Sequence, residues 1–269
     1  MNVSRNFAVI ELEDNKELYL LRGGDFDKLR IDSFLEKEPE TLIWLNRLNK
    51  QDVLWDIGAN IGVYSIYASK TIGNKSYAFE PSSNNTLFIQ QNINANKLND
   101  LVTLYPIAVG KDHSYDLLDS KDNQYGHTGS EVRGSEYGNN NTKYLKEKYT
   151  QGCVVDSIDS LVEKGVPPPT HLKIDVDGLE PDIIKGAIKT LPKVKSILVE
   201  VVTKTHRKEM PEAKYATPEV VEAHKNLLKY LKDIGFEEDQ TLTSYSKLRC
   251  YKSGFEGLFN FICYNKNVE

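Results

Sequence analysis

The residues with the plainest chemical meaning are two acids and two glycines near the ends of short apolar segments. Asp56 lies near the end of the segment Val53–Ile57, and Gly58 and Gly62 enclose the turn behind it. Gly58 can adopt a positive φ that lets a ligand approach the backbone, and Gly62 permits close packing of a helix on a strand. Glu80 follows Gly62 by 18 residues, near the offset of about 20 at which an acid binds ribose hydroxyls on nucleotide-binding sheets. The spacing predicts a nucleoside site.

The turn from Gly58 to Gly62 differs from two common phosphate-binding motifs. A dinucleotide fingerprint would be Gly-x-Gly-x-x-Gly, and a nucleoside triphosphate loop would end in Gly-Lys-Ser or Gly-Lys-Thr. The sequence here is Gly58-Ala59-Asn60-Ile61-Gly62 and matches neither motif. Asp56, so close to the turn, would repel a pyrophosphate but suits an ammonium or sulfonium group. We therefore expect a cationic nucleoside in this turn.

Acids also cluster near the end of the predicted strand His171–Val176. Asp175, Asp177 and Glu180 lie within six residues of one another, and at least one of them is expected to act in catalysis or substrate binding. An alternative is that Glu180 stabilises the N-terminus of the helix that follows. A less favoured alternative is that Asp175 and Asp177, on one face of a strand, bind a divalent cation together with Glu200.

Histidines are the other candidates for a base that removes a hydroxyl proton, because a neutral imidazole is available near pH 7. His206 lies just beyond the predicted strand Ser196–Val202, on the expected ligand side, and His127 lies in a polar segment. The competing interpretation of each is a solvated loop histidine. Asp175, Glu180 and His206 are therefore the predicted catalytic residues, with no preference among them.

The segments that must position these residues alternate between strand-like and helix-like patterns. Predicted strands cover Val53–Ile57, Ser76–Phe79, Val102–Ala108, His171–Val176 and Ser196–Val202. Predicted helices cover Ile61–Lys70, Asn84–Asn96, Asp156–Lys164 and Pro181–Leu191. This alternation predicts an α/β fold with a mostly parallel sheet and helices on both faces. Ligands of such sheets bind beyond the carboxyl ends of the strands, which is where Asp56, Glu80 and Asp175 are expected.

Three segments break the alternation. Residues 1–50 are expected to form a cap, with a hairpin over Phe7–Leu12 and Glu17–Arg22 and a helix whose apolar face contains Leu42, Ile43, Leu45 and Leu48. Residues 51–269 form the predicted main domain, in which the polar insertion 110–151 is expected to shape a substrate site. The C-terminal part is predicted to contain a helix and two strands, over Pro218–Ile234, Phe236–Leu242 and Phe259–Tyr264.

Composition excludes several classes of protein. With 39% hydrophobic and 27% charged residues, the chain is neither disordered nor fibrous. Its net charge of −5 disfavours a nucleic-acid partner. Cys153, Cys250 and Cys263 are widely spaced and indicate reduced thiols. No apolar segment is long enough for a signal peptide or a membrane span. We therefore predict a cytoplasmic protein, and the sequence leaves its oligomeric state open.

Three motifs together resemble the FkbM-type methyltransferases. They are Asp56-Ile57-Gly58-Ala59-Asn60-Ile61-Gly62-Val63-Tyr64-Ser65, Phe79-Glu80-Pro81 and Leu172-Lys173-Ile174-Asp175-Val176-Asp177-Gly178-Leu179-Glu180. Supporting matches are Glu38-Pro39-Glu40, Asn92, Asn94-Ala95-Asn96, Ala108-Val109-Gly110, Val155–Leu161 and Gly186. The resemblance covers roughly residues 38–202. One departure is Asp177, where the family usually has Glu.

The resemblance implies a Rossmann-like methyltransferase fold with a seven-stranded sheet whose last strand is antiparallel. It also implies S-adenosyl-L-methionine as cofactor and O-methylation of a hydroxyl on a small molecule or a sugar (a glycan). On this basis Glu80 binds the ribose and Asp175 lies near the transferring methyl. The other implied cofactor contacts are Asp56, Gly58, Ala59, Asn60 and Gly62 at the methionine end, and Pro81 and Ala108 beside the adenine.

Two other functions share this fold. An NAD-dependent oxidoreductase would keep the ribose acid, but it requires the tighter glycine spacing that is absent here. A non-catalytic nucleotide-binding module would keep the pocket without turnover. No metal site is predicted.

Overall fold

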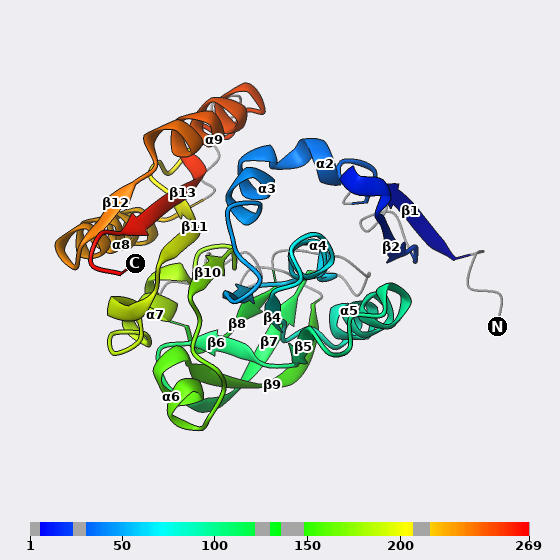
Figure 1. Cartoon of the computed structure of the whole chain (residues 1–269). Coiled ribbons are helices and arrows are strands. Elements are labelled where there is room, and N and C mark those ends of the chain that lie inside the picture. The colour runs from blue at the N-terminus through cyan, green and yellow to red at the C-terminus, as the bar shows by residue number, and fades with distance from the viewer. Residues whose placement is uncertain (1–5, 24–30, 122–129, 136–147, 207–215, 269) are drawn as a thin grey trace.

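A seven-stranded sheet runs through the centre of the computed structural model, which describes residues 6–23, 31–121, 130–135, 148–206 and 216–268 (Figure 1). In spatial order its strands are β12 (Phe236–Glu238), β13 (Leu258–Asn265), β11 (Ser196–Val202), β10 (His171–Ile174), β3 (Val53–Ile57), β4 (Lys75–Phe79) and β5 (Val102–Tyr105). Strand β13 is antiparallel to both of its neighbours, and the other neighbouring pairs are parallel. The predicted α/β class and the antiparallel last strand are confirmed.

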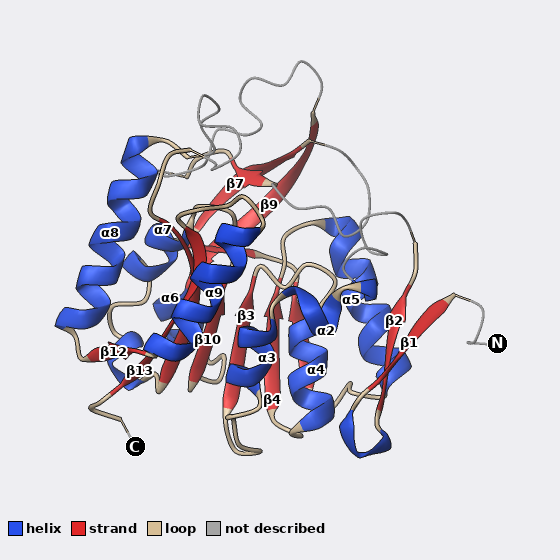
Figure 2. Cartoon of the chain, turned by 90° about the horizontal axis from the view of Figure 1, so that it is seen from above, coloured by secondary structure: helices blue, strands red, loops and turns tan. Residues whose placement is uncertain are grey.

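Helices cover both faces of this sheet, because parallel strands require crossover connections. One face is covered by α3 (Pro39–Leu45), α4 (Val63–Thr71) and α5 (Ser83–Asn96), and the other by α6 (Ile158–Glu163), α7 (Glu180–Lys185) and α8 (Pro218–Asp233) (Figure 2). Side chains of a strand alternate between the two cores: Leu54 packs in the first, and Trp55 and Ile57 in the second. The near-continuous apolar segment at β3 is therefore buried on both sides.

The N-terminal segment packs into the first of these cores. Strands β1 (Phe7–Glu11) and β2 (Glu17–Leu21) form the predicted hairpin around a short 3-10 turn, η2 (Glu13–Asn15), and α2 (Phe34–Lys37) precedes α3. The amide of Leu21 donates to Asn92 Oδ1 at 2.7 Å on α5. The helix prediction was wrong about Ile43, which is 46% exposed, because Trp44 is the buried residue there. The Trp44 indole donates to Ser196 Oγ at 2.9 Å.

The polar insertion contains a second sheet in the order β6 (Ala108–Gly110), β9 (Tyr149–Ser157), β7 (Ser114–Ser120), β8 (Glu131–Val132). The predicted strand Val102–Ala108 ends instead at Tyr105, before Pro106, and Ala108 begins β6. Asp119 is buried in this sheet and accepts hydrogen bonds from Arg133, Lys148 and Thr150. Leu118, Val132 and Val155 of this sheet form a small apolar cluster beside that buried charge. His127 lies outside the described residues.

The C-terminal part contains a helix that sequence analysis missed. The strand predicted over Phe236–Leu242 was wrong beyond Glu238, because α9 (Gln240–Lys252) begins there. The Asp239 carboxylate accepts from Leu242 N at 3.0 Å and caps the helix. The predicted helix Pro181–Leu191 is also shorter, since α7 ends at Lys185 and is followed by a 3-10 turn, η3 (Leu191–Lys193). Helix α9 packs on β13 and reaches the sheet edge where the candidate site lies.

Candidate functional site

A cavity of about 630 Å³ opens at the carboxyl ends of β3, β4, β10 and β11, which is the size of a small-molecule site. Strand β3 is flanked by β4, which follows it directly in the sheet's chain order, and by β10, which comes later in the chain. The direction of the connections therefore reverses at β3, which makes this a topological switch point. Helix α9 and the segment around α2 contribute the far wall. Segments from the beginning, middle and end of the chain thus meet at one cavity.

The glycine turn after β3 closes one end of this cavity. Gly58 has φ 81°, and a Cβ there would lie 2.0 Å from the Asp175 carbonyl oxygen, so only glycine fits. The amides of Gly58 and Ala59 both donate to the Phe79 carbonyl at 3.0 Å, and Gly62 N donates to Ala59 O. Because these donors already have acceptors, the turn is poorly equipped to hold a pyrophosphate, which requires backbone N–H groups.

Glu80 is held rigidly at the end of β4. Its carboxylate is 6% exposed, accepts from Asn60 N at 2.9 Å and Ser82 N at 3.0 Å, and lines the cavity. Pro81 and Ala108 line the cavity beside it. A carboxylate offers about four lone-pair sites, and Asn85 Nδ2 also donates to Glu80 Oε1 at 3.4 Å. Its role toward a ligand stays a prediction.

Asp56 lies behind the turn and does not line the cavity. Its fully buried carboxylate accepts from Ser65 N at 3.1 Å and Ser65 Oγ at 2.7 Å. Burial raises the pKa of Asp56, although Lys173 and Ser65 oppose that shift. The Asp56 carboxylate is bonded to the first turn of α4. Asp56 would therefore affect the methionine end of the cofactor only indirectly, by positioning the glycine turn.

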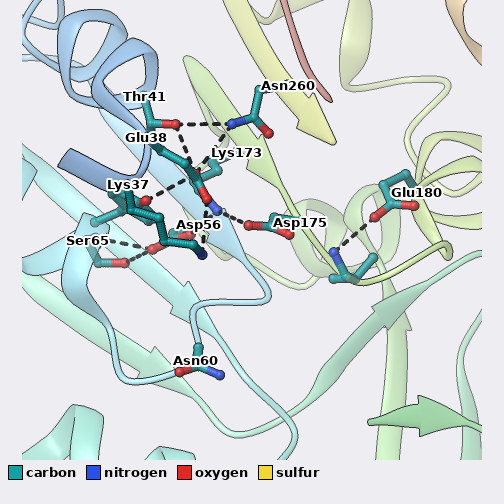
Figure 3. A network of polar contacts seen from close by, with 12 residues as sticks. Lys37, Glu38, Thr41, Asp56, Asn60, Ser65, Lys173, Asp175, Glu180 and Asn260 are labelled. Carbon is teal, nitrogen blue, oxygen red and sulfur yellow. Dashed lines mark hydrogen bonds and ion pairs between the residues drawn. The ribbon is translucent and has the colours of Figure 1, made fainter. Parts of the chain in front are cut away.

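Lys173 is the buried cation at the centre of this edge (Figure 3). Its side chain is 1% exposed, and its Nζ lies 3.0 Å from Asp175 Oδ2, 3.9 Å from Asp56 Oδ1 and 4.8 Å from the centre of the Tyr64 ring. Burial alone would lower the pKa of Lys173, but Asp175, Asp56 and Glu38 raise it above its ordinary value. Lys173 therefore stays charged and fixes the Asp175 carboxylate at the rim of the cavity.

Glu38 and Glu40 bring the N-terminal segment into the same network. The Glu38 carboxylate accepts from Tyr64 Oη at 3.0 Å and from Asn260 Nδ2 at 3.4 Å. Burial would raise the pKa of Glu38, but Lys37, Lys173 and Arg249 lower it to about 2. Fully buried Glu40 accepts from Arg249 Nη2 at 2.8 Å. Lys37, Glu38 and Arg249 all line the cavity.

Asp177 and Glu200 complete the acidic lining of the cavity. Burial and the charges of Asp175, Asp177, Glu180 and Glu38 raise the pKa of Glu200 well above its ordinary value. The lining residues that the structure describes include six carboxylates and two cations, namely Glu36, Glu38, Glu80, Asp175, Asp177 and Glu200 against Lys37 and Arg249. Such an excess of negative charge favours a ligand that carries a positive charge.

Glu180 and His206, two of the predicted catalytic residues, do not line the cavity. The buried Glu180 carboxylate accepts from Val176 N at 3.0 Å and Gly178 N at 3.3 Å, and lies 2.9 Å from His224 Nε2. In Figure 3 Glu180 is set apart from the network around Lys173. It orders the turn that contains Asp177, while His206 is exposed. The geometry places Asp175 alone of the three at the cavity.

Sequence analysis named Lys173 and Glu38 only as parts of matched motifs, gave neither a role in the site, and did not name Arg249. The signal for Lys173 was available, because a lysine within the apolar segment His171–Ile174 is unusual in a strand buried on both faces. In the described part of the chain, no three His, Cys, Asp or Glu side chains are placed to hold a metal ion. The divalent-cation alternative with Asp175, Asp177 and Glu200 therefore lacks a built site. None of the described helices is long and apolar enough to cross a membrane.

Comparison with known proteins gives a family match and a relative of known name. A family model described as "Methyltransferase FkbM domain" matches residues 56–238. The protein named hexuronic acid methyltransferase AglP, from Haloferax volcanii, is 30% identical over 173 residues, or 64% of this chain. This chain spans 65% of the length of that relative, slightly less than two thirds.

Solved structures also resemble the chain. An O-methyltransferase from Bacillus cereus in complex with SAH is 11% identical, with a TM-score of 0.47 over 90% of this chain and 89% of that one. A putative rRNA-methylase from Clostridium thermocellum is 10% identical, with a TM-score of 0.47 over 85% of this chain and 97% of that one.

Proposed function

Because the chain belongs to the FkbM methyltransferase family, we propose that it transfers a methyl group from S-adenosylmethionine to a hydroxyl oxygen of a sugar or another small polyol. The family match supports the methyl transfer. The relative named for hexuronic acid methylation supports a sugar acceptor. The resemblance of the sequence to a family of mainly O-methyltransferases supports oxygen as the acceptor atom.

One observation carries the proposal: a fixed acid, Glu80, and a glycine turn that tolerates no side chain stand at one end of a cavity rich in carboxylates. These features fit a sulfonium nucleoside. Glu80 would accept hydrogen bonds from the ribose hydroxyls, and Pro81 and Ala108 would border the adenine. The turn at Gly58 and Asn60 would leave room for the amino-acid part.

S-adenosylmethionine, when bound, supplies an electrophilic methyl carbon on a positively charged sulfur. The chain's own contribution is to hold donor and acceptor in line, which can lower the barrier by several kcal/mol. Asp175, fixed by Lys173 at 3.0 Å, would stabilise the positive charge at the carboxyl end of β10. The walls from α2 and α9 would exclude water from the acceptor.

Isothermal titration with S-adenosylhomocysteine tests the donor site. The change Glu80→Gln removes a charged acceptor while keeping its shape, and hydrogen bonds to charged groups are worth about 1.5–3 kcal/mol. We therefore expect S-adenosylhomocysteine to bind about 10–100-fold more weakly. Glu163→Gln, which changes an exposed acid on α6, is the matched control and should leave the affinity unchanged. Equal affinity of wild type and Glu80→Gln would refute the ribose assignment.

The two alternative functions have separate tests. If the protein were an NAD-dependent enzyme, NADH would compete with S-adenosylhomocysteine for binding. The amides of Gly58 and Ala59 already donate to the Phe79 carbonyl, which argues against that outcome. If the protein were a non-catalytic module, it would bind the donor but transfer no labelled methyl group to any sugar in a panel of neutral, amino and acidic sugars. Transfer to any sugar of the panel would exclude the module.

A further inference from the structure

Glu200 occupies a distinctive place among the acids of the cavity. It lies on β11 directly opposite Asn260 of β13, and its side chain lines the cavity. Its carboxylate makes no hydrogen bond or ion pair with any residue in the described ranges, whereas Asp175 is paired with Lys173 and Glu80 with backbone amides. A carboxylate that reaches a cavity without such a partner is available to a ligand.

The groups that face Glu200 come from several elements. Carboxylates surround it from the turn after β10, from α7 and from the segment before α3, namely Asp175, Asp177, Glu180 and Glu38. On α9 the neighbours are Arg249, which is paired with Glu40, and Cys250. Burial, and to a lesser extent Glu200, raise the pKa of the Cys250 thiol to about 11, so this thiol is uncharged at pH 7.

We infer that Glu200 is the general base that takes the proton from the acceptor hydroxyl. This inference rests on the proposed methyl transfer. As the acceptor oxygen forms its new bond to the methyl carbon, its proton passes to a Glu200 oxygen. The carbon–sulfur bond breaks, its electron pair stays on sulfur, and the sulfonium becomes a neutral thioether. The acceptor leaves as a methyl ether, and Glu200 later loses the proton to solvent.

The surroundings of Glu200 suit this role. Burial together with four neighbouring carboxylates raises the pKa of Glu200 well above its ordinary value, and a carboxylate with a raised pKa is a stronger base toward a hydroxyl proton. The positive sulfonium of the donor has the opposite effect, since a nearby cation stabilises the carboxylate. Binding of the charged donor should therefore favour the charged form of Glu200 more than binding of the neutral S-adenosylhomocysteine does.

The first test is kinetic. Glu200→Gln keeps the side-chain shape and should lower kcat about 10²–10⁴-fold, the usual contribution of a general base. Affinity for S-adenosylhomocysteine should stay within about twofold of wild type. Glu200→Asp keeps a carboxylate and should recover part of the rate, which a merely structural role would not predict. Glu222→Gln, an exposed acid on α8, is the charge-matched control.

The second test measures protons directly. Titration of the donor in two buffers of different ionisation enthalpy should show more protons released by S-adenosylmethionine than by S-adenosylhomocysteine near pH 7. In Glu200→Gln this difference should disappear. A variant with wild-type kcat, or with the same proton release, would overturn the inference while leaving methyl transfer intact. A wild-type protein that binds no donor would instead overturn the proposed function, and the inference with it.

Discussion

The two halves of the cavity are built in different ways. The proposed donor half consists of the glycine turn and Glu80, whose contact with Asn60 joins residues 20 positions apart. The proposed acceptor half is lined by Glu38, Glu200 and Arg249, and the contacts that hold Arg249 and Glu38 join residues 209 and 222 positions apart. The donor half is therefore encoded as a short motif, while the acceptor half exists only once the chain has folded.

The halves also differ in what stabilises them. Backbone hydrogen bonds and a glycine without room for a side chain shape the donor half. Buried charges in direct contact shape the acceptor half, where Arg249 bonds fully buried Glu40. We therefore expect the donor half to be sensitive to added volume and the acceptor half to be sensitive to lost charge. Lys173 lies between them and should affect both.

Lys173→Met should have the largest effect. Removal of one partner from a buried charge network destabilises proteins by about 3–5 kcal/mol, because the remaining charges stay buried without compensation. Urea unfolding should show this loss, together with weaker binding of S-adenosylhomocysteine. Lys189→Met removes an exposed lysine paired with Glu163 and should change stability little, because solvent screens such a surface pair. Similar losses in both variants would contradict the central place of Lys173.

Arg249→Met should have a smaller effect that is confined to the acceptor half. It leaves Glu40 buried with Asn260 as its remaining described donor, and the loss of such a charged partner costs about 2–3 kcal/mol. The KM for the acceptor should rise severalfold, while the affinity for S-adenosylhomocysteine stays within about twofold. If donor affinity fell as much as acceptor affinity, the two halves would not be separable.

Gly58→Ala should act on the donor half. A Cβ at Gly58 would lie 2.0 Å from the Asp175 carbonyl oxygen, so the backbone must shift in addition to the strain of a positive φ, which alone costs about 1–3 kcal/mol. We expect S-adenosylhomocysteine to bind at least about tenfold more weakly. Gly152→Ala is the matched control, because a Cβ there meets nothing within 4 Å. Unchanged binding in Gly58→Ala would show that the turn does not border the donor.

Sequence analysis predicted most of the sheet and the residues of the proposed donor half from the same kind of pattern. Strands buried on both faces are continuous apolar segments, as in Val53–Ile57 and Ser196–Val202, and glycines and acids at their ends stand out against them. Both of those strands were predicted with the boundaries that the structure shows. The motif positions Gly58, Asn60, Glu80 and Asp175 all line the cavity.

The remaining features could not be predicted because they depend on contacts between distant segments. Helix α9 contains many β-branched and aromatic residues and has no clear apolar face, so its helical state depends on packing against β13. The strands of the insertion combine a small apolar cluster, which includes Leu118, Val132 and Val155, with the buried charge of Asp119. Glu180 and Asp175 are both acids near the end of β10, and the sequence does not distinguish their roles. In the structure Asp175 lines the cavity, whereas Glu180 accepts a hydrogen bond from Val176 N and does not line the cavity.

The bond between Glu38 and Asn260 has a consequence for synthesis of the protein. The ribosome adds about 5–20 residues per second, so the 222 residues between these partners take about 11–44 s to be made. During that interval the carboxylates of Glu38 and Glu40 have neither Asn260 nor Arg249 beside them and must stay hydrated. A nascent chain can thus form the glycine turn early, yet the cavity wall from α9 can form only after α9 and β13 have emerged and packed together.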